Sequence, residues 1–289
     1  MRIRGNKKKL NPELIDIFVF ERIEGAIEFP KAIKEKMKYA YCGDRQISVN
    51  ILKFIISEGY QPALLIVSDK KSASHSNELI AISSLKREQI VYSSDLKSPE
   101  IIRKIKALDL DYIIGVHFPF IISNEILSLP KVGFLNLHPA YLPYNKGWHT
   151  PSWAILDETK YGATLHFMAE ELDAGDIIHQ KELKVEMSDT ADSLYKKVLK
   201  LEEEVFKEAF EDLISLNPKR IKQELSGTSH LKKDLEDVRE IKLDEKYTGS
   251  ELINKLRSLT TNNMAEAAYF IKDGKKYLVQ VKIEESDIE

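Results

Sequence analysis

The chain has 289 residues, of which 43% are hydrophobic and 31% charged, enough for one large α/β domain with a smaller appendage. Its formal net charge of −3 gives no overall attraction to nucleic acid or to an anionic membrane, and no apolar run approaches the roughly 20 residues of a membrane span. The single cysteine, Cys42, excludes an internal disulfide, and without a Cys/His cluster it indicates no metal site. We therefore expect a cytoplasmic protein with no membrane or nucleic-acid partner and no metal.

The N-terminal half begins with an extension, residues 1–36, to which no role can be assigned, because a new β-rich run starts at Met37. Residues 38–43 predict a strand. Ile47, Ile51 and Ile55 then lie at helical spacing in a helix that ends near Gly59, and the apolar run 64–67 predicts the next strand. This order is typical of a βαβ unit.

Three more strands are predicted over residues 88–92, 112–116 and 133–137. Between the first two of them, Ser98, Pro99 and Glu100 supply an N-cap, an N1 proline and an acidic first turn for another helix. Near-continuous apolar strands that alternate with helices predict a Rossmann-like, mostly parallel sheet with helices on both faces. Because ligands of such sheets bind at the carboxyl ends of the strands, the chemistry is expected after residue 137.

The second half predicts a short helix from Thr150, a strand over residues 163–168 and a long helix from about Thr190, with residues 202–204 on its solvated face. From residue 215 the sequence becomes loop-rich, with a helix capped at Ser250 and two strands joined by a turn at residues 273–274. The chain therefore divides into a catalytic domain, residues 37–214, and a small α+β C-terminal subdomain, residues 215–289.

Three polar residues stand where the chemistry is expected. Asn136 and His138 end a buried strand and project to the same side, because side chains alternate along a strand. Asp173 lies in the turn 171–176 between two strand-like runs, which can return its carboxylate to that site. A carboxylate favours a charged imidazole, and an amide donor stabilises charge on a carbonyl oxygen under attack, so the trio suits acyl transfer without a covalent enzyme intermediate.

The pattern Asn136-x-His138-Pro139 with Leu142-Pro143, followed by residues 172–176 (Leu-Asp-Ala-Gly-Asp), resembles the folate-dependent formyltransferase family over roughly residues 37–185. The resemblance implies a Rossmann-like fold, N10-formyltetrahydrofolate as the formyl donor, and catalytic roles for Asn136, His138 and Asp173. Either a charged His138 that stabilises the oxyanion or a neutral His138 that acts as general base is compatible with it. The residues expected to contact the folate are Phe120, Ile121, Ile122, Met168, Glu170 and Leu172.

Within that family, residues 138–147 and 227–236 are most similar to the nucleotide-sugar N-formyltransferases. This implies a nucleotide-linked 4-amino-4,6-dideoxyhexose as acceptor, in the synthesis of a surface polysaccharide or other glycan, and a homodimer for which the apolar run 277–283 offers an edge strand. The residues expected to contact the acceptor are Gly43, Arg45, Tyr144, Lys146 and Trp148.

Three other functions remain. A methionyl-tRNA formyltransferase is less favoured, because residues 181–289 carry more acidic than basic side chains. A formyltetrahydrofolate hydrolase uses the same three residue types, and a folate or nucleotide sensor would need a broken site.

Several of the residues named above have a simpler structural interpretation. Residues 43–45 could equally form a plain strand-to-helix turn, and Trp148 could equally pack as line a pocket. The residues expected only to pack are Cys42, His117, Trp153 and His166.

Overall fold

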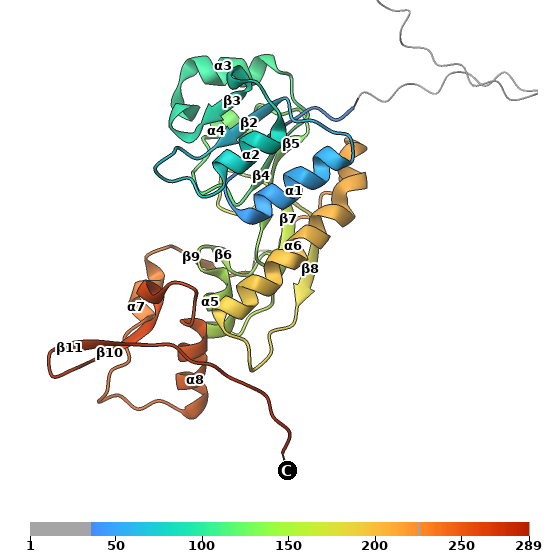
Figure 1. The fold of residues 1–289 in the computed structure, drawn as a ribbon. Coiled ribbons are helices and arrows are strands. Elements are labelled where there is room, and N and C mark those ends of the chain that lie inside the picture. The colour runs from blue at the N-terminus through green and yellow to red at the C-terminus, as the bar shows by residue number, and fades with distance from the viewer. Residues whose placement is uncertain (1–35, 225, 289) are drawn as a thin grey trace, which may run out of the picture. The chain divides into compact units, whose positions relative to one another are not determined.

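A computed structural model describes residues 36–224 and 226–288, and the chain from Met37 onward forms one compact unit (Figure 1). Apart from Lys36, the predicted N-terminal extension lies outside the described residues. None of the described helices combines the length and apolar character needed to cross a bilayer.

A seven-stranded sheet forms the centre of this unit, in the order β3-β2-β1-β4-β5-β7-β8. The first five strands in this order pair in parallel, and β7 and β8 are antiparallel to their neighbours. The bounds are β1 (Tyr39–Gly43), β2 (Leu64–Val67), β3 (Ile90–Tyr92), β4 (Tyr112–Val116), β5 (Gly133–His138), β7 (Tyr161–Phe167) and β8 (Ile177–Leu183). The predicted mostly parallel α/β sheet is confirmed, although β3 is shorter than expected because residues 87–89 form a 3₁₀ turn.

The sheet is buried on both faces, which explains the near-continuous apolar strands. Along β1, Tyr39 and Tyr41 belong to one hydrophobic cluster, whereas Ala40 and Cys42 belong to another on the opposite face. Cys42 is therefore a buried packing residue, as expected, although its side chain also reaches the wall of a cavity described below.

Helices cover both faces of the sheet. α1 (Gln46–Ser57) and α6 (Ala191–Ile214) lie side by side on one face, where the Phe54 and Phe210 rings meet edge to face at 5.1 Å (Figure 1). α3 (Pro99–Ala107) and α4 (Asn124–Leu127) contribute to the cluster on the other face. α2 (Ser76–Ser83) is absent from the predicted elements because its sequence, SNELIAIS, has little helical periodicity.

The expectation that residues 202–204 all lie on a solvated helix face is wrong for Glu202. Its carboxylate is fully buried and accepts from His117 Nε2, at 2.8 and 3.0 Å to its two oxygens. His117 follows β4 with a left-handed backbone conformation, φ 49°, and so turns its ring toward α6. A charged group on the packed face of α6 is tolerated because this partner is present.

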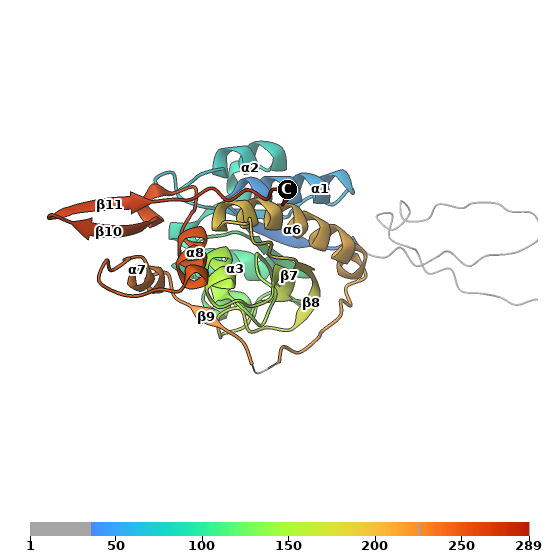
Figure 2. The same cartoon turned by 90° about the horizontal axis from the view of Figure 1, so that it is seen from below.

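The C-terminal part contains α7 (Asp234–Val238), α8 (Gly249–Ser258) and the hairpin β10 (Ala268–Lys272) and β11 (Lys275–Val279), which extends away from α8 (Figures 1 and 2). The predicted hairpin turn is confirmed, since Asp273 and Gly274 both have positive φ, as a type I′ turn requires. Thr248, not Ser250, caps α8. β11 ends at Val279, so the predicted apolar strand 277–283 is only partly a strand.

Among the contacts that join this part to the sheet domain are one made by β6 and one made by α5. β6 (Lys146–Gly147) pairs in parallel with β9 (Ser229–His230). α5 (Thr150–Leu156) packs against α8, and Trp153 of α5 is 7% exposed in a cluster with Leu235, Leu259 and Ala268. Trp153 therefore packs, as expected. The division of the chain at residues 214 and 215 stays a prediction.

Candidate active site

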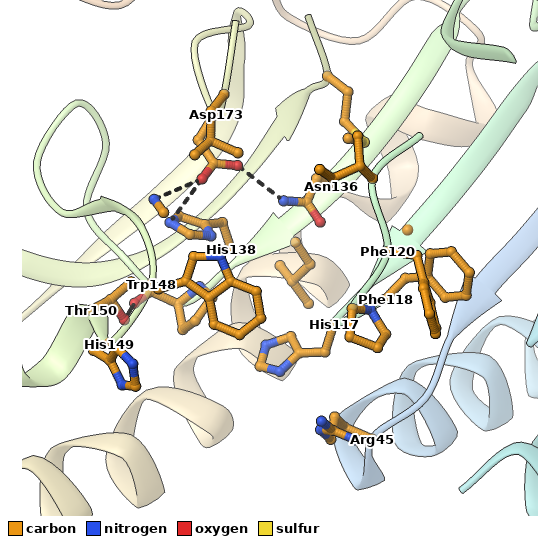
Figure 3. Close-up of a pocket in the computed structure, with 18 of the residues that line it drawn as sticks. Arg45, His117, Phe118, Phe120, Asn136, His138, Trp148, His149, Thr150 and Asp173 are labelled. Atoms are coloured by element: carbon orange, nitrogen blue, oxygen red, sulfur yellow. Dashed lines mark hydrogen bonds and ion pairs between the residues drawn. The ribbon is translucent and has the colours of Figure 1, made fainter. Parts of the chain in front are cut away.

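A cavity of about 820 Å³ opens at the carboxyl ends of β4 and β5, where the sheet topology predicts a ligand (Figure 3). Its wall comes from both strands, from the loop between β7 and β8, from the start of α6 and from the C-terminal part. The lining residues used below are Arg45, His117, Phe118, Phe120, Ile121, Ile122, Asn136, His138, Trp148, His149, Met168, Glu170, Leu172, Asp173, Tyr195, Thr261, Asn262 and Glu266.

The three predicted catalytic residues meet at one edge of this cavity. Asn136 and His138 lie on the same side of β5, and Asp173 reaches them from the loop that joins β7 to β8 (Figure 3). Asn136 Nδ2 donates to Asp173 Oδ1 at 3.5 Å, and His138 Nε2 lies 3.6 Å from Asp173 Oδ2. The structure therefore brings together the amide, the imidazole and the carboxylate as the sequence predicted.

The loop that carries Asp173 is held in place by hydrogen bonds to its backbone and by close packing at Gly175. Gln223 Nε2 donates to the carbonyls of Asp173 and Gly175, at 2.8 and 2.7 Å. Gly175 is required here, because a Cβ at this position would lie 1.9 Å from the carbonyl oxygen of Phe167. The Asp173 carboxylate accepts in addition from the Gly147 N–H at 3.0 Å. These contacts of the protein itself hold the carboxylate at the edge of the cavity.

Asp173 is a buried anion, with 8% of its side chain exposed. Burial alone would raise the pKa of this carboxyl, but His138, His166, the Gly147 N–H and Lys146 outweigh burial and lower the pKa below its usual value. Asp173 is therefore ionised at neutral pH, and its charge favours a proton on the neighbouring imidazole.

The proton on His138 is placed by its surroundings. Its side chain is 8% exposed, and Nε2 faces the carbonyl oxygen of Asn145 at 3.4 Å as well as Asp173 Oδ2. Both of these atoms can only accept, so Nε2 carries a hydrogen. Asn145 is in turn fixed through its amide, which donates to Thr159 Oγ1 and to the Lys160 carbonyl.

A fourth polar side chain, His166, belongs to this edge, although the sequence indicated only packing. His166 lies in β7 directly opposite Asn136 in the antiparallel β5–β7 pair, so the two side chains share one face. Its Nε2 is 3.3 Å from Asn136 Nδ2 and 3.7 Å from Asp173 Oδ1, and its side chain is fully buried. Only the strand register reveals this contact, because His166 lies 30 residues from Asn136 along the chain.

All six residues expected to contact the folate line the cavity. They come from two segments of the chain, residues 120–122 and 168–172, and most of their side chains are apolar. Phe118 extends this surface, with its ring centroid 5.2 Å from that of Phe120, and Ile121 is 99% exposed. An exposed apolar surface beside a polar edge fits a flat aromatic ring that carries hydrogen-bonding groups.

The residues expected to contact the acceptor divide into two groups. Arg45 and Trp148, both 44% exposed, line the cavity, whereas Gly43, Tyr144 and Lys146 do not. Gly43 lies where α1 packs on the sheet, and a Cβ there would meet Ser48 Cβ at 2.6 Å.

Tyr144 and Lys146 are held away from the lining by the turn that follows β5. Tyr144 closes a turn by donating from its backbone N–H to the Tyr141 carbonyl, and Lys146 pairs with β9 through its backbone. Lys146 is nevertheless near enough to Asp173 to help lower its pKa.

The sequence also missed a group of lining residues opposite the trio. His117 and Tyr195 lie there with Arg45, and Thr261, Asn262 and Glu266 come from the segment after α8. His149, the N-cap of α5, also lines the cavity, and the sequence allowed either a pocket or a packing role for it. Burial lowers the pKa of His149, although Glu266, 4.0 Å from its Nδ1, opposes that effect. These residues are scattered along the chain, so no local motif marks them.

Two family models match the chain. The model described as formyl transferase matches residues 43–210, and the model described as N-formyltransferase dimerization C-terminal domain matches residues 234–285. Asn136, His138, His166 and Asp173 all lie within the first match.

Curated proteins and solved structures also resemble the chain. The dTDP-4-amino-4,6-dideoxyglucose formyltransferase of Mycobacterium bovis is 33% identical over 150 residues, which span 52% of this chain and 64% of that protein. A methionyl-tRNA formyltransferase of Bacillus cereus is 29% identical over 77% of this chain and 72% of its own length. The crystal structure of a 4-N formyltransferase from Francisella tularensis has a TM-score of 0.74 and 28% identity, covering 86% of this chain and 99% of that one.

Proposed function

The chain belongs to the formyl transferase family, and we propose that it transfers a formyl group from N10-formyltetrahydrofolate to the amino group of a nucleotide-linked amino sugar. The observation that carries this proposal is the meeting of Asn136, His138 and Asp173 at the edge of a cavity that also offers an apolar surface. The acceptor is proposed to be a 4-amino-4,6-dideoxyhexose, since a relative named for dTDP-4-amino-4,6-dideoxyglucose matches the chain and a 4-N formyltransferase matches its fold.

The donor is proposed to bind between residues 120–122 and 168–172, which fit the flat pterin ring. The backbone groups of residues 120–122 and the carboxylate of Glu170 offer hydrogen-bond partners for its edge. When bound there, the donor supplies the formyl carbon beside the trio.

In the proposed mechanism the trio acts mainly through electrostatics. Asn136 and His138 donate hydrogen bonds to the formyl oxygen as it gains negative charge, and Asp173 keeps His138 oriented and protonated at Nε2. The neutral amine nitrogen forms a bond to the formyl carbon while the bond from that carbon to N10 breaks, and the proton lost by the amine ends on N10 of the departing tetrahydrofolate. The low exposure of His138 and Asp173 keeps water from weakening these interactions.

A hydrogen-bond donor at Nε2 of His138 is favoured over a general base that acts through this atom. Both neighbours of Nε2, Asp173 and the Asn145 carbonyl, are acceptors, so a lone pair at this atom would meet only other lone pairs. The pH dependence of turnover separates the two assignments: a general base requires turnover to fall as His138 becomes protonated, whereas a charged donor requires it to fall as His138 loses its proton.

The diphosphate of the acceptor is proposed to lie at the opposite end of the cavity, beside Arg45 and His117 (Figure 3). Arg45 lies close enough to Tyr195 to lower its pKa, against the larger effects of burial and Glu202. The Arg45 guanidinium is a suitable donor for phosphate oxygens, whereas the Nε2–H of His117 is held by Glu202.

The tRNA alternative is less favoured. The C-terminal part matches the N-formyltransferase dimerization model, and residues 181–289 carry more acidic than basic side chains, which is unfavourable for a tRNA backbone. We propose instead that this part forms a homodimer interface. A cytoplasmic location and a role in glycan synthesis are included in the proposal, because charged folates and nucleotide sugars do not cross membranes unaided.

The test is release of tetrahydrofolate from N10-formyltetrahydrofolate with a panel of nucleotide-linked amino sugars, charged initiator tRNA and a control without acceptor. Turnover with one amino sugar supports the proposal. Turnover only with tRNA supports the alternative, and release without any acceptor identifies a hydrolase. Binding of folate or nucleotide without turnover in any arm indicates a sensor and overturns the proposed activity.

A further inference from the structure

His166 has no role in the mechanism proposed above, although it contacts the amide of Asn136. His166 Nδ1 lies 2.8 Å from the carbonyl oxygen of Phe167. A carbonyl can only accept, so Nδ1 carries a hydrogen. Burial lowers the pKa of His166 to about 4, against an opposing effect of Asp173, so the ring is neutral at physiological pH. A neutral ring with a hydrogen on Nδ1 has a lone pair on Nε2.

That lone pair faces Asn136. The distance between His166 Nε2 and Asn136 Nδ2 is 3.3 Å, and an acceptor at Nε2 requires a donor opposite it. Asn136 must therefore present its NH₂ group, rather than its carbonyl oxygen, to His166. The same nitrogen lies 3.5 Å from Asp173 Oδ1, another atom that can only accept. The two acceptors thus select one of the two possible orientations of the amide.

We propose, on the basis of the formyl transfer proposed above, that His166 is a positioning residue which accepts a hydrogen bond from Asn136 and thereby keeps its second N–H available to the formyl oxygen. At 3.5 Å, the bond from that N–H to Asp173 is long, so exchanging it for a developing oxyanion costs little. If the amide turned by 180°, its oxygen would replace the NH₂ group and repel both Asp173 and the oxyanion.

Of the two nearest titratable neighbours, His138 lowers the pKa of His166 further and supports a neutral ring, whereas Asp173 opposes it. The His138 ring stands edge-on to it, with the ring centroids 6.1 Å apart, and Asp173 Oδ1 is 3.7 Å from Nε2. A proton on Nε2 would point at Asp173 and turn the Asn136 NH₂ group away. The tautomer of one buried histidine therefore decides which atom Asn136 offers to the substrate.

Two substitutions that differ in which ring nitrogen they imitate test the proposal. His166→Gln can place an amide oxygen near the position of Nε2 and keeps an acceptor for Asn136. His166→Asn keeps a donor for the Phe167 carbonyl but is too short to reach Asn136. We expect kcat to fall by about 10² in His166→Asn, because the amide loses its orientation, while KM for donor and acceptor stays within about twofold. His166→Gln should regain most of kcat.

Equal losses of kcat in the two variants, or a loss expressed in KM alone, would contradict the proposal. Thermal unfolding of both variants and their binding of 5-formyltetrahydrofolate serve as controls for folding of the site. ¹⁵N NMR of the wild-type imidazoles gives a second readout that needs no variant: Nδ1 of His166 should be protonated and Nε2 unprotonated at neutral pH. A proton on Nε2 overturns the inference. If the wild type transfers formyl to no acceptor while this tautomer is observed, the proposed function fails and the hydrogen-bond assignment stands.

Discussion

The two ends of the cavity are built in different ways. At the chemical end, Asn136, His138 and His166 stand on the adjacent strands β5 and β7, and the histidine side chains are 8% and 0% exposed. At the proposed acceptor end, Arg45 and Trp148 are each 44% exposed and come from turns outside these strands. One end is a closed hydrogen-bonded network, and the other is open to solvent.

This difference separates the chemistry from the choice of acceptor. The strand register and the Asp173 loop fix the polar atoms of the chemical end, so these atoms can act in the proposed formyl transfer without deciding which acceptor is used. The acceptor end draws residues from the turn before α1, from α5 and α6 and from the segment after α8, and the connecting segments among them tolerate change. We therefore expect substitutions at the two ends to affect different kinetic constants.

Replacing Asn136 should have the largest effect. In Asn136→Ala the formyl oxygen loses one donor, which costs about 2.7–4 kcal/mol in the barrier, so kcat should fall by roughly 10²–10³ with little change in KM for the acceptor. Asn124→Ala, an exposed substitution on α4, is the matched control. Stopped assays of tetrahydrofolate release measure both variants. Turnover near the wild-type level in Asn136→Ala would remove this residue from the mechanism.

Acidification should destabilise the protein through the chemical end. The folded chain holds His166 neutral with a pKa of about 4, whereas the unfolded chain binds a proton near 6.5, so the unfolded state gains the proton first. The contribution of His166 to the free energy of unfolding is fully present above pH 6.5. It decreases by on the order of 3 kcal/mol as the pH falls toward 4.

Urea unfolding between pH 7.5 and 4.5 measures this decrease in the free energy of unfolding. The substitution His166→Gln should abolish the part of the pH dependence that His166 causes. His179→Gln, at a part-exposed position on β8, is the control. An unchanged slope in His166→Gln would mean that other groups cause the acid sensitivity. His149 at the acceptor end contributes in the same direction, because burial lowers its pKa as well.

Substitutions at the acceptor end should change the KM of the acceptor. In Arg45→Ala the proposed diphosphate loses a charged hydrogen-bond donor, and the acceptor KM should rise by about tenfold, corresponding to about 1.4 kcal/mol, while kcat at saturation is retained. Lys70→Ala removes an exposed cation that does not line the cavity and serves as the control. If Arg45→Ala lowers kcat and leaves KM unchanged, Arg45 does not anchor the acceptor.

Much of the fold follows from the sequence. Apolar runs buried on both faces predicted five parallel strands, because only a covered parallel sheet buries such runs, and the turn signal at Asp273 and Gly274 predicted the hairpin. α2 and β6 were not predicted, because the first is weakly periodic and the second has two residues.

The sequence by itself determined the parallel sheet and placed Asn136 and His138 on one side of a strand end, since strand periodicity is a local property. It also marked Asp173 through its motif. Only the tertiary structure decided that His166 joins Asn136, that Glu202 is buried against His117, and that Tyr144 and Lys146 stay outside the cavity lining. These contacts depend on strand register and on helix packing between segments far apart in the chain, and no local pattern of residues records either one.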